Sequence, residues 1–256
     1  MDAAPIPPPP SGVAPSEPSS LTDRLTNVIA APGEVFDEIK NAPVRASNWL
    51  VPLILSCVVT VVYICIAFSQ PAVLQSMQEQ RESVMHKKVA AGKITQAQAD
   101  QGAAITERFL TPTILKAIGA IGAIVALVAG LFLMGAGICL ALKWCTTASL
   151  GFMKAVEICG LALMIDVPQK ILRILLVLWK GNLLATASPT LFLANPSTTN
   201  RADVFLSMID VVDIWWLAVL SLGLSKVAAI PYRTAAFISF GIWYGFRIVI
   251  GLLTTF

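Results

Sequence analysis

Five long apolar stretches separated by shorter polar segments dominate the chain after residue 48. They lie at about residues 49–68, 114–142, 152–179, 208–227 and 234–256. A membrane-spanning helix needs about 20 consecutive, mostly apolar residues, and each stretch is long enough to supply them. The pattern therefore predicts an all-α polytopic membrane protein with about five transmembrane helices, which together form a domain over residues 49–256.

Two different patterns precede the first apolar stretch. Residues 1–19 are a low-complexity, proline-rich tail, a composition that favours polyproline II and cannot build a core. Residues 20–48 contain two amphipathic helical patterns, with Ser20 and Asp23 placed as a capping box and Pro32 placed to start the second helix. Their apolar stripes consist of Leu21, Leu25, Val28 and Ile29 in the first helix, and Val35, Phe36 and Ile39 in the second. Such helices before a span predict an interfacial platform, and packing on a soluble partner or domain is the alternative.

A polar segment at residues 70–111 separates the first two apolar stretches. Its pattern predicts an extramembrane insert in the form of a helical hairpin, with one helix around 72–90, a break at Gly92, and a second helix from Thr95 toward Phe109. The apolar face of this insert is thin, so we expect the hairpin to be mobile or to lean on the membrane surface.

The third apolar stretch carries charges that a lipid environment disfavours, namely Glu157, Asp166, Lys170 and Arg173. An ionised side chain at a helix centre costs about 2.5–3.5 kcal/mol on insertion, whereas a large aliphatic residue returns about 0.3–0.6 kcal/mol. The stretch would therefore not insert alone. Pro168 interrupts it near the middle and predicts a kink.

The spacing of these charges favours pairing. Asp166, Lys170 and Arg173 share one helical face, and Asp166 precedes Lys170 by four positions in the favourable order. Asp213 of the fourth stretch and Arg247 of the fifth can pair across helices. These five residues form a candidate intramembrane polar cluster, which is either a set of internally neutralised charges or a functional polar site between helices.

Small residues recur at four-residue spacing in two apolar stretches. The second stretch contains Gly119, Gly122, Ala123, Ala126 and Gly130, and the fifth contains Gly241 and Gly245. This spacing lets helix backbones approach closely. We therefore expect tight helix packing at these positions, within one chain or in a homo-oligomer, and packing within the chain is the favoured interpretation.

The composition agrees with a membrane protein and narrows the chemistry. The chain is 56% hydrophobic and 13% charged, and its net charge of +3 is too small and too dispersed to predict nucleic-acid binding. The five cysteines lie in or beside apolar runs without CxxC spacing, and the single histidine, His86, is far from them. No nucleophile and base are spaced for catalysis. We therefore expect a protein that is not an enzyme, with no catalytic, cofactor-binding or metal site.

The basic residues bear on orientation. Arg45 and the short turns that carry Lys143, Lys154, Lys226 and Arg233 lie near the membrane on one side of a five-span arrangement. Because basic residues are enriched in cytoplasmic segments, this distribution predicts a cytoplasmic N-terminus.

Several features resemble the Yip1-domain family of integral membrane proteins. They are APGEVF at 31–36, Trp49, Pro52, the long third stretch with Pro168, and DIWW at 213–216 followed by Gly223-Leu224. Their order and spacing carry the resemblance, which covers residues 21–256. Eukaryotic members are associated with Rab GTPases and vesicle traffic, but their acidic, aromatic N-terminal motif is not present here. The proline-rich tail and helical insert are more similar to bacterial members, so the resemblance implies five spans in a bacterial inner membrane.

Two functions are consistent with these patterns. The first is a non-enzymatic membrane scaffold or partner-binding protein with a role in membrane organisation or trafficking, supported by the amphipathic helices and the lack of catalytic spacing. The second is a small-solute or ion transporter that uses the buried charges of the third to fifth stretches, although no inverted repeat is visible. Neither pattern identifies a partner beyond the lipid bilayer.

Overall fold

In this computed structural model, the described residues are 19–109, 111–193, 196 and 200–254. Their regular secondary structure is helical and no strand occurs among them, so the predicted all-α class is confirmed. The proline-rich tail predicted at residues 1–19 lies, apart from Ser19, outside the described residues.

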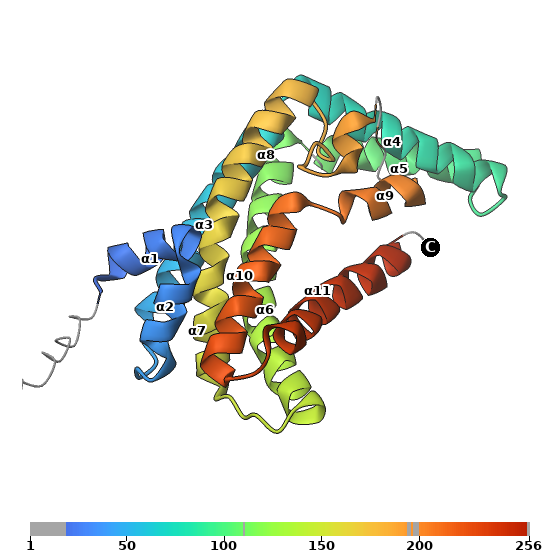
Figure 1. Ribbon diagram of the computed structural model, residues 1–256. Helices are drawn as coiled ribbons and strands as arrows, with labels where there is room; N and C mark the ends of the chain where they lie inside the picture. The colour runs from blue at the N-terminus through green and yellow to red at the C-terminus, as the bar shows by residue number, and fades with distance from the viewer. Residues whose placement is uncertain (1–18, 110, 194–195, 197–199, 255–256) are drawn as a thin grey trace, which may run out of the picture.

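The helices form an upright bundle with a hairpin across one end (Figure 1). In chain order they are α1 (Leu21–Ala30), α2 (Pro32–Lys40), α3 (Ser47–Ala67), α4 (Pro71–Ala90), α5 (Gln96–Phe109), α6 (Pro112–Cys145), α7 (Phe152–Ala162), the 3-10 turn η1 (Leu163–Ile165), α8 (Asp166–Lys180), the 3-10 turn η2 (Pro189–Phe192), α9 (Arg201–Ser207), α10 (Val211–Ala228) and α11 (Tyr232–Thr254). Helices α3, α6, α7 and α10 pack around one hydrophobic core, whereas α11 diverges from the bundle toward its C-terminal end.

Three helices among the described residues are long and apolar enough to cross a membrane, namely α3, α6 and α10. This is fewer than the five predicted from the sequence. The third apolar stretch is not one helix, because η1 divides it into α7 and α8 and neither half is long enough. Helix α11 is not among these three, and the side chains of its last residues lie outside the described part of the chain.

The two N-terminal helices have the predicted ends. The capping box of Ser20 and Asp23 is present, and Pro32 occupies the first turn of α2. Their apolar stripes are covered by protein, since Val28 and Phe36 are fully buried in the main core and α2 packs along α10. Protein packing therefore accounts for their amphipathic pattern, and a position at the membrane interface stays a prediction.

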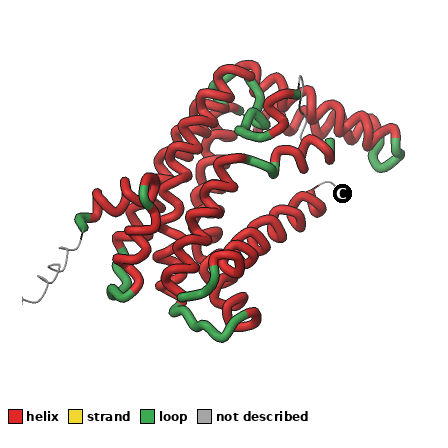
Figure 2. The backbone as a smooth tube through the Cα atoms, viewed as in Figure 1, coloured by secondary structure: helices red, strands yellow, loops and turns green. Residues whose placement is uncertain are grey.

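The predicted helical hairpin is confirmed as α4 and α5. Gly92 lies in the turn between them with a φ of 66°, a left-handed conformation that favours glycine. Short connections tie the hairpin to the ends of α3 and α6 (Figure 2). At its root, Val73 of α4 is fully buried against Ala67 and Val177, which fixes the hairpin to the end of the bundle.

Five of the small residues predicted at helix contacts do not make such contacts within the chain. A Cβ atom added at Gly122, Gly130, Gly241 or Gly245 would meet no heavy atom within 4 Å among the described residues, and Ala126 is exposed. For Gly122, Ala126 and Gly130 of the second stretch, the favoured interpretation of packing within one chain is therefore wrong. The physical reason is that these five positions lie on faces of α6 and α11 that no neighbouring helix covers, and the homo-oligomer alternative stays a prediction. Gly119 of the same pattern does lie against the chain, since a Cβ atom there would be 3.3 Å from the side chains of Ile64 and Phe68.

The close backbone approaches occur at other glycines. A Cβ atom at Gly160 would lie 2.3 Å from Cβ of Trp49, and one at Gly223 would lie 2.7 Å from the Phe36 ring. Glycine is required at these two positions because α3 and α2 pack directly against the helix backbones there.

Candidate functional site

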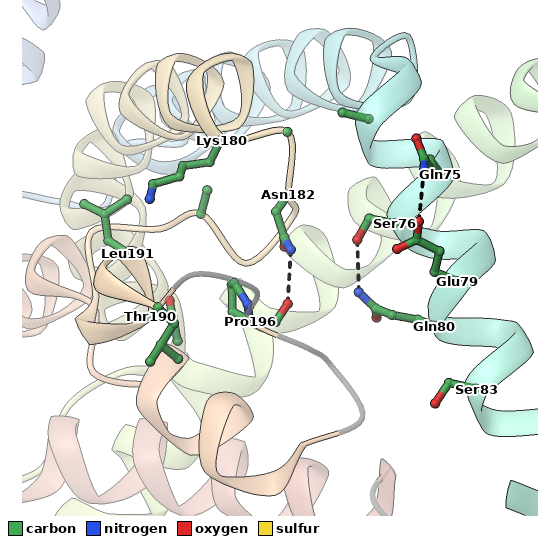
Figure 3. Close-up of a pocket in the computed structure, with 14 residues that line it drawn as sticks. Gln75, Ser76, Glu79, Gln80, Ser83, Lys180, Asn182, Thr190, Leu191 and Pro196 are labelled. Atoms are coloured by element: carbon green, nitrogen blue, oxygen red, sulfur yellow. Dashed lines mark hydrogen bonds between the residues drawn. The ribbon is translucent and has the colours of Figure 1, made fainter.

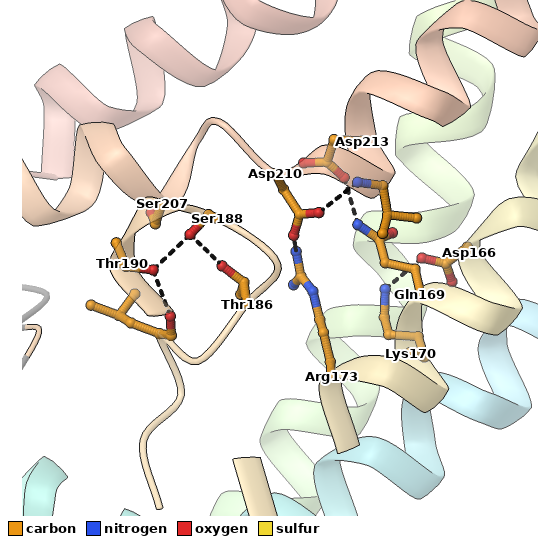
Figure 4. A network of polar contacts seen from close by, with 12 residues as sticks. Asp166, Gln169, Lys170, Arg173, Thr186, Ser188, Thr190, Ser207, Asp210 and Asp213 are labelled. Carbon is orange, nitrogen blue, oxygen red and sulfur yellow. Dashed lines mark hydrogen bonds and ion pairs between the residues drawn. The ribbon is translucent and has the colours of Figure 1, made fainter. Parts of the chain in front are cut away.

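The break in the third apolar stretch determines where its charges lie. Helix α7 ends at Ala162, η1 follows, and Asp166 is the first residue of α8. Pro168 falls in the first turn of α8, where its missing N–H needs no acceptor. The predicted kink corresponds to a 3-10 turn through which the backbone stays in the right-handed helical region. Gln169 and Arg173 of α8 reach Asp213 and Asp210 at the beginning of α10 (Figure 4).

Asp166 and Lys170 form the ion pair that their spacing predicts. Lys170 Nζ lies 2.5 Å from Asp166 Oδ1. Both side chains are largely buried, with 14% and 10% of their surface exposed for Lys170 and Asp166. The pair is local to α8 and neutralises two of its charges without a second helix.

Arg173 pairs with Asp210, a residue that was not included in the predicted cluster. The distance from Arg173 Nη2 to Asp210 Oδ2 is 3.2 Å. The other carboxylate oxygen of Asp210 accepts the backbone N–H of Val212 at 2.9 Å and so caps α10. An aspartate immediately before an apolar helix is a typical N-cap, and this signal could have indicated its buried position.

Asp213 joins two further helices to α10. Its Oδ1 accepts a hydrogen bond from Gln169 Nε2 of α8 at 2.7 Å, and its Oδ2 pairs with Arg247 of α11. The Arg247 guanidinium also lies 5.5 Å from the ring centroid of Trp243, four positions earlier on α11, so the two side chains form a cation–π contact.

All five predicted cluster residues thus belong to one polar network near the start of α10, but they are arranged as separate pairs. Asp166 contacts Lys170, whereas Arg173 and Arg247 are bound by the two aspartates of α10. The network connects α8, α10 and α11 and leaves no described cation of the predicted cluster without a carboxylate partner.

A second polar group in the bundle was not predicted as a site. Glu157 of α7 is fully buried and contacts Lys154 Nζ at 2.8 Å, Asn48 Nδ2 at 2.6 Å and the backbone N–H of Arg45 at 3.1 Å. Lys154 also donates to the carbonyl oxygens of Ile39 and Ala42, at 2.5 and 3.0 Å. This group ties α7 to α3 and to the end of α2, which no local spacing in the sequence could indicate.

The chemistry available in the polar network is ionic and hydrogen-bonding. Among the described residues, no group of three or more histidine, cysteine, aspartate or glutamate side chains is placed to hold a metal ion. In the part of the chain that the structure describes, two buried polar atoms of the network, Asp166 Oδ2 and Arg173 Nε, have no hydrogen-bond partner. The arrangement can hold α8, α10 and α11 in fixed positions relative to one another. Asp166 Oδ2 can accept one further hydrogen bond, and Arg173 Nε can donate one.

Comparisons with known proteins assign neither a family nor a neighbouring fold. No family model, no curated protein and no solved structure matches this chain.

Proposed function

We propose that this chain is an integral membrane protein without enzymatic activity, which acts as a scaffold that binds a protein partner. The observation that carries the proposal is the pairing of the buried charges. Lys170, Arg173 and Arg247 each contact a carboxylate within the chain. Charges that are already paired and hydrogen-bonded hold helices together, and breaking such pairs to admit a solute is costly.

The hairpin of α4 and α5 is the part of the fold best placed for a partner. It extends away from the bundle (Figure 1), and its tip carries the exposed lysines Lys87, Lys88 and Lys93. Side chains there are not engaged in the core, so they are available to another molecule. By contrast, α1 and α2 contribute buried core residues, and deleting them would disturb the fold before it tested any binding role.

Partner capture from native membranes tests this proposal. Replacing Lys87, Lys88 and Lys93 by serine should abolish the recovery of a partner that the unaltered protein captures reproducibly. A matched control replaces two exposed lysines elsewhere, Lys40 and Lys143, and should retain the partner. If the hairpin variant captures the partner as well as the control does, the hairpin is not the binding surface.

The resemblance to Yip1-domain proteins supports a position in a bacterial inner membrane with a cytoplasmic N-terminus. We propose this location on the order and spacing of the shared features and on the basic residues near the apolar stretches. A reporter active only in the cytoplasm should be active when fused at Met1. An inactive reporter at that position would reverse the proposed orientation.

Transport is the second candidate, and one specific observation favours it. Asp166 Oδ2 and Arg173 Nε are buried without a hydrogen-bond partner beside the break between α7 and α8. Ionisable side chains inside a membrane protein are typical of substrate and ion pathways. Reconstitution in liposomes distinguishes the two functions: an ion- or solute-dependent flux that Asp166→Asn removes would establish transport, whereas flux equal to that of empty liposomes would exclude it.

A further inference from the structure

A polar cavity lies between the hairpin and the segment that follows α8. Its volume is about 490 Å³, and its two walls are α4 and the stretch beyond Trp179. Figure 3 shows Gln75, Ser76 and Glu79 on the α4 wall, with Lys180 and Asn182 on the other side. The cavity is separate from the polar network of α8, α10 and α11 and from the exposed lysines of the hairpin tip.

The position of the cavity corresponds to the end of the bundle. A small apolar cluster of Ala67, Val73 and Val177 lies at the root of the hairpin next to it, and α3, which is apolar enough to cross a membrane, ends at Ala67. Trp179, with 70% of its surface exposed, ends α8 together with Lys180. Tryptophan and lysine at a helix end are typical of the lipid headgroup level.

Two opposite charges line this cavity without neutralising each other. Glu79 accepts a hydrogen bond from Gln75 at 3.0 Å, and the Lys180 ammonium lies 4.9 Å from the centroid of its neighbouring Trp179 ring. Among the described residues, neither side chain forms an ion pair. Both side chains are exposed to solvent, so water hydrates them in the absence of a ligand. A ligand that carries both an anion and a cation can replace this water with a contact to each charge.

We propose that this cavity binds a phosphoethanolamine group, with its phosphate at Lys180 and its primary ammonium at Glu79. Lysine is a common phosphate ligand. An ammonium with three N–H donors suits the carboxylate of Glu79 and the side-chain oxygens of Gln75 and Ser76. Because the cavity lies at the headgroup level, phosphatidylethanolamine is one source of this group and free phosphoethanolamine is the other.

The lining also determines which headgroups are disfavoured. No aromatic side chain lines the cavity in the described part of the chain, and quaternary ammonium groups are recognised chiefly by aromatic faces. A phosphatidylglycerol headgroup has no cation and leaves Glu79 without compensation. The site should therefore prefer phosphatidylethanolamine to both phosphatidylcholine and phosphatidylglycerol.

Lipid binding to the full-length protein in detergent tests this inference. Native mass spectrometry should show phosphatidylethanolamine retained at least about tenfold more strongly than the other two lipids, as expected for one additional charge-assisted contact. Glu79→Gln should remove the preference over phosphatidylglycerol, and Lys180→Gln should weaken all three lipids. The controls Glu82→Gln and Lys93→Gln change exposed charges outside this cavity and should leave the preference intact.

The same measurements distinguish the lipid from free phosphoethanolamine as the ligand, and they also test whether the cavity binds this group at all. Competition by free phosphoethanolamine against the lipid shows that the headgroup alone suffices, whereas retention of the lipid only shows that the acyl chains contribute. Equal retention of phosphatidylcholine, or an unchanged preference in Glu79→Gln, overturns the proposal. Partner capture by the hairpin does not depend on this result, so either proposal can fail alone.

Discussion

Helices α7 and α8 come from one apolar stretch of sequence, yet they occupy different environments. Every residue of α7 from Ala155 to Ala162 is buried, because α3, α6 and α10 pack around this helix. Helix α8 buries few positions, and Ile171, Leu175 and Leu178 each expose half or more of their surface. One half of the stretch is the centre of the bundle, whereas the other half is an amphipathic helix at its side.

The difference changes what a charge does in each helix. Glu157 of α7 has no route to solvent, so protein groups from α3 and α7 must satisfy its carboxylate. Asp166, Lys170 and Arg173 lie on the inward face of α8 and pair either locally or with Asp210 at the start of α10, and their side chains retain 10–23% exposure. We therefore expect substitutions in α7 to destabilise the fold more than substitutions in α8.

The largest effect is expected for Glu157→Ala. It leaves Lys154 largely buried without its carboxylate and removes the acceptor of Asn48, at a cost of about 3–5 kcal/mol in the free energy of unfolding. Unfolding in detergent measures the loss. Glu157→Gln keeps an acceptor for Asn48 and should cost less; equal losses for the two variants would show that charge is not the important property.

The second-largest loss of stability is expected for Gly160→Ala. The new Cβ would lie 2.3 Å from Cβ and 2.4 Å from Cα of Trp49, so α3 must move away from α7. Overpacking typically costs about 1–3 kcal/mol, and contact with backbone favours the upper end. Gly122→Ala is the matched control, because no described heavy atom lies within 4 Å of its added Cβ, and it should leave thermal stability unchanged or slightly raised.

A smaller effect is expected for Arg173→Met in α8. The change removes the partner of Asp210, but Asp210 retains its hydrogen bond to Val212. We expect a loss of about 1.5–2 kcal/mol in the free energy of unfolding, the lower part of the range for hydrogen bonds to charged groups. Lys180→Met on the same helix removes a charge without a carboxylate partner and should have little effect. A loss as large as that of Glu157→Ala would contradict the ranking of the two helices.

The smallest effect is expected for the Asp166 and Lys170 pair. The pair is local to one helix, and Lys170 has a flexible stem that can redirect its ammonium toward water. A double-mutant cycle with Asp166→Ala and Lys170→Ala should give a coupling energy of about 0.5–1 kcal/mol. The same cycle with Arg173→Ala in place of Lys170→Ala should give none, since Arg173 pairs with Asp210.

The sequence predicted what depends on local spacing. The capping box at Ser20, the hairpin turn at Gly92 and the pair of Asp166 with Lys170 all follow from neighbours within a few residues. It could not predict which glycines contact another helix. Gly122 and Gly160 are equally small, and only the arrangement of helices places Trp49 against Gly160 and leaves Gly122 open.

The same limit explains the partners of the charges. Arg173 and Asp210 are 37 residues apart, and Asn48 and Glu157 are 109 apart. From the sequence alone, each charge of the third stretch had several possible partners. Which partner it contacts depends on the direction that α8 takes after the 3-10 turn η1. The break was expected only as a kink at Pro168, because the sequence does not show that a 3-10 turn ends α7 ahead of the proline.

The docking of α2 also has a consequence for the order of assembly during synthesis. The Ile39 carbonyl accepts a hydrogen bond from Lys154, 115 residues later in the chain, and Asp37 pairs with Lys226, 189 residues later. The Phe36 ring packs against Gly223 of α10. The N-terminal helices therefore leave the ribosome long before their binding surface exists. Until α10 is inserted, their apolar stripes must be covered by the lipid surface or by a chaperone, so α1 and α2 are made before α10 but reach their final positions only after it.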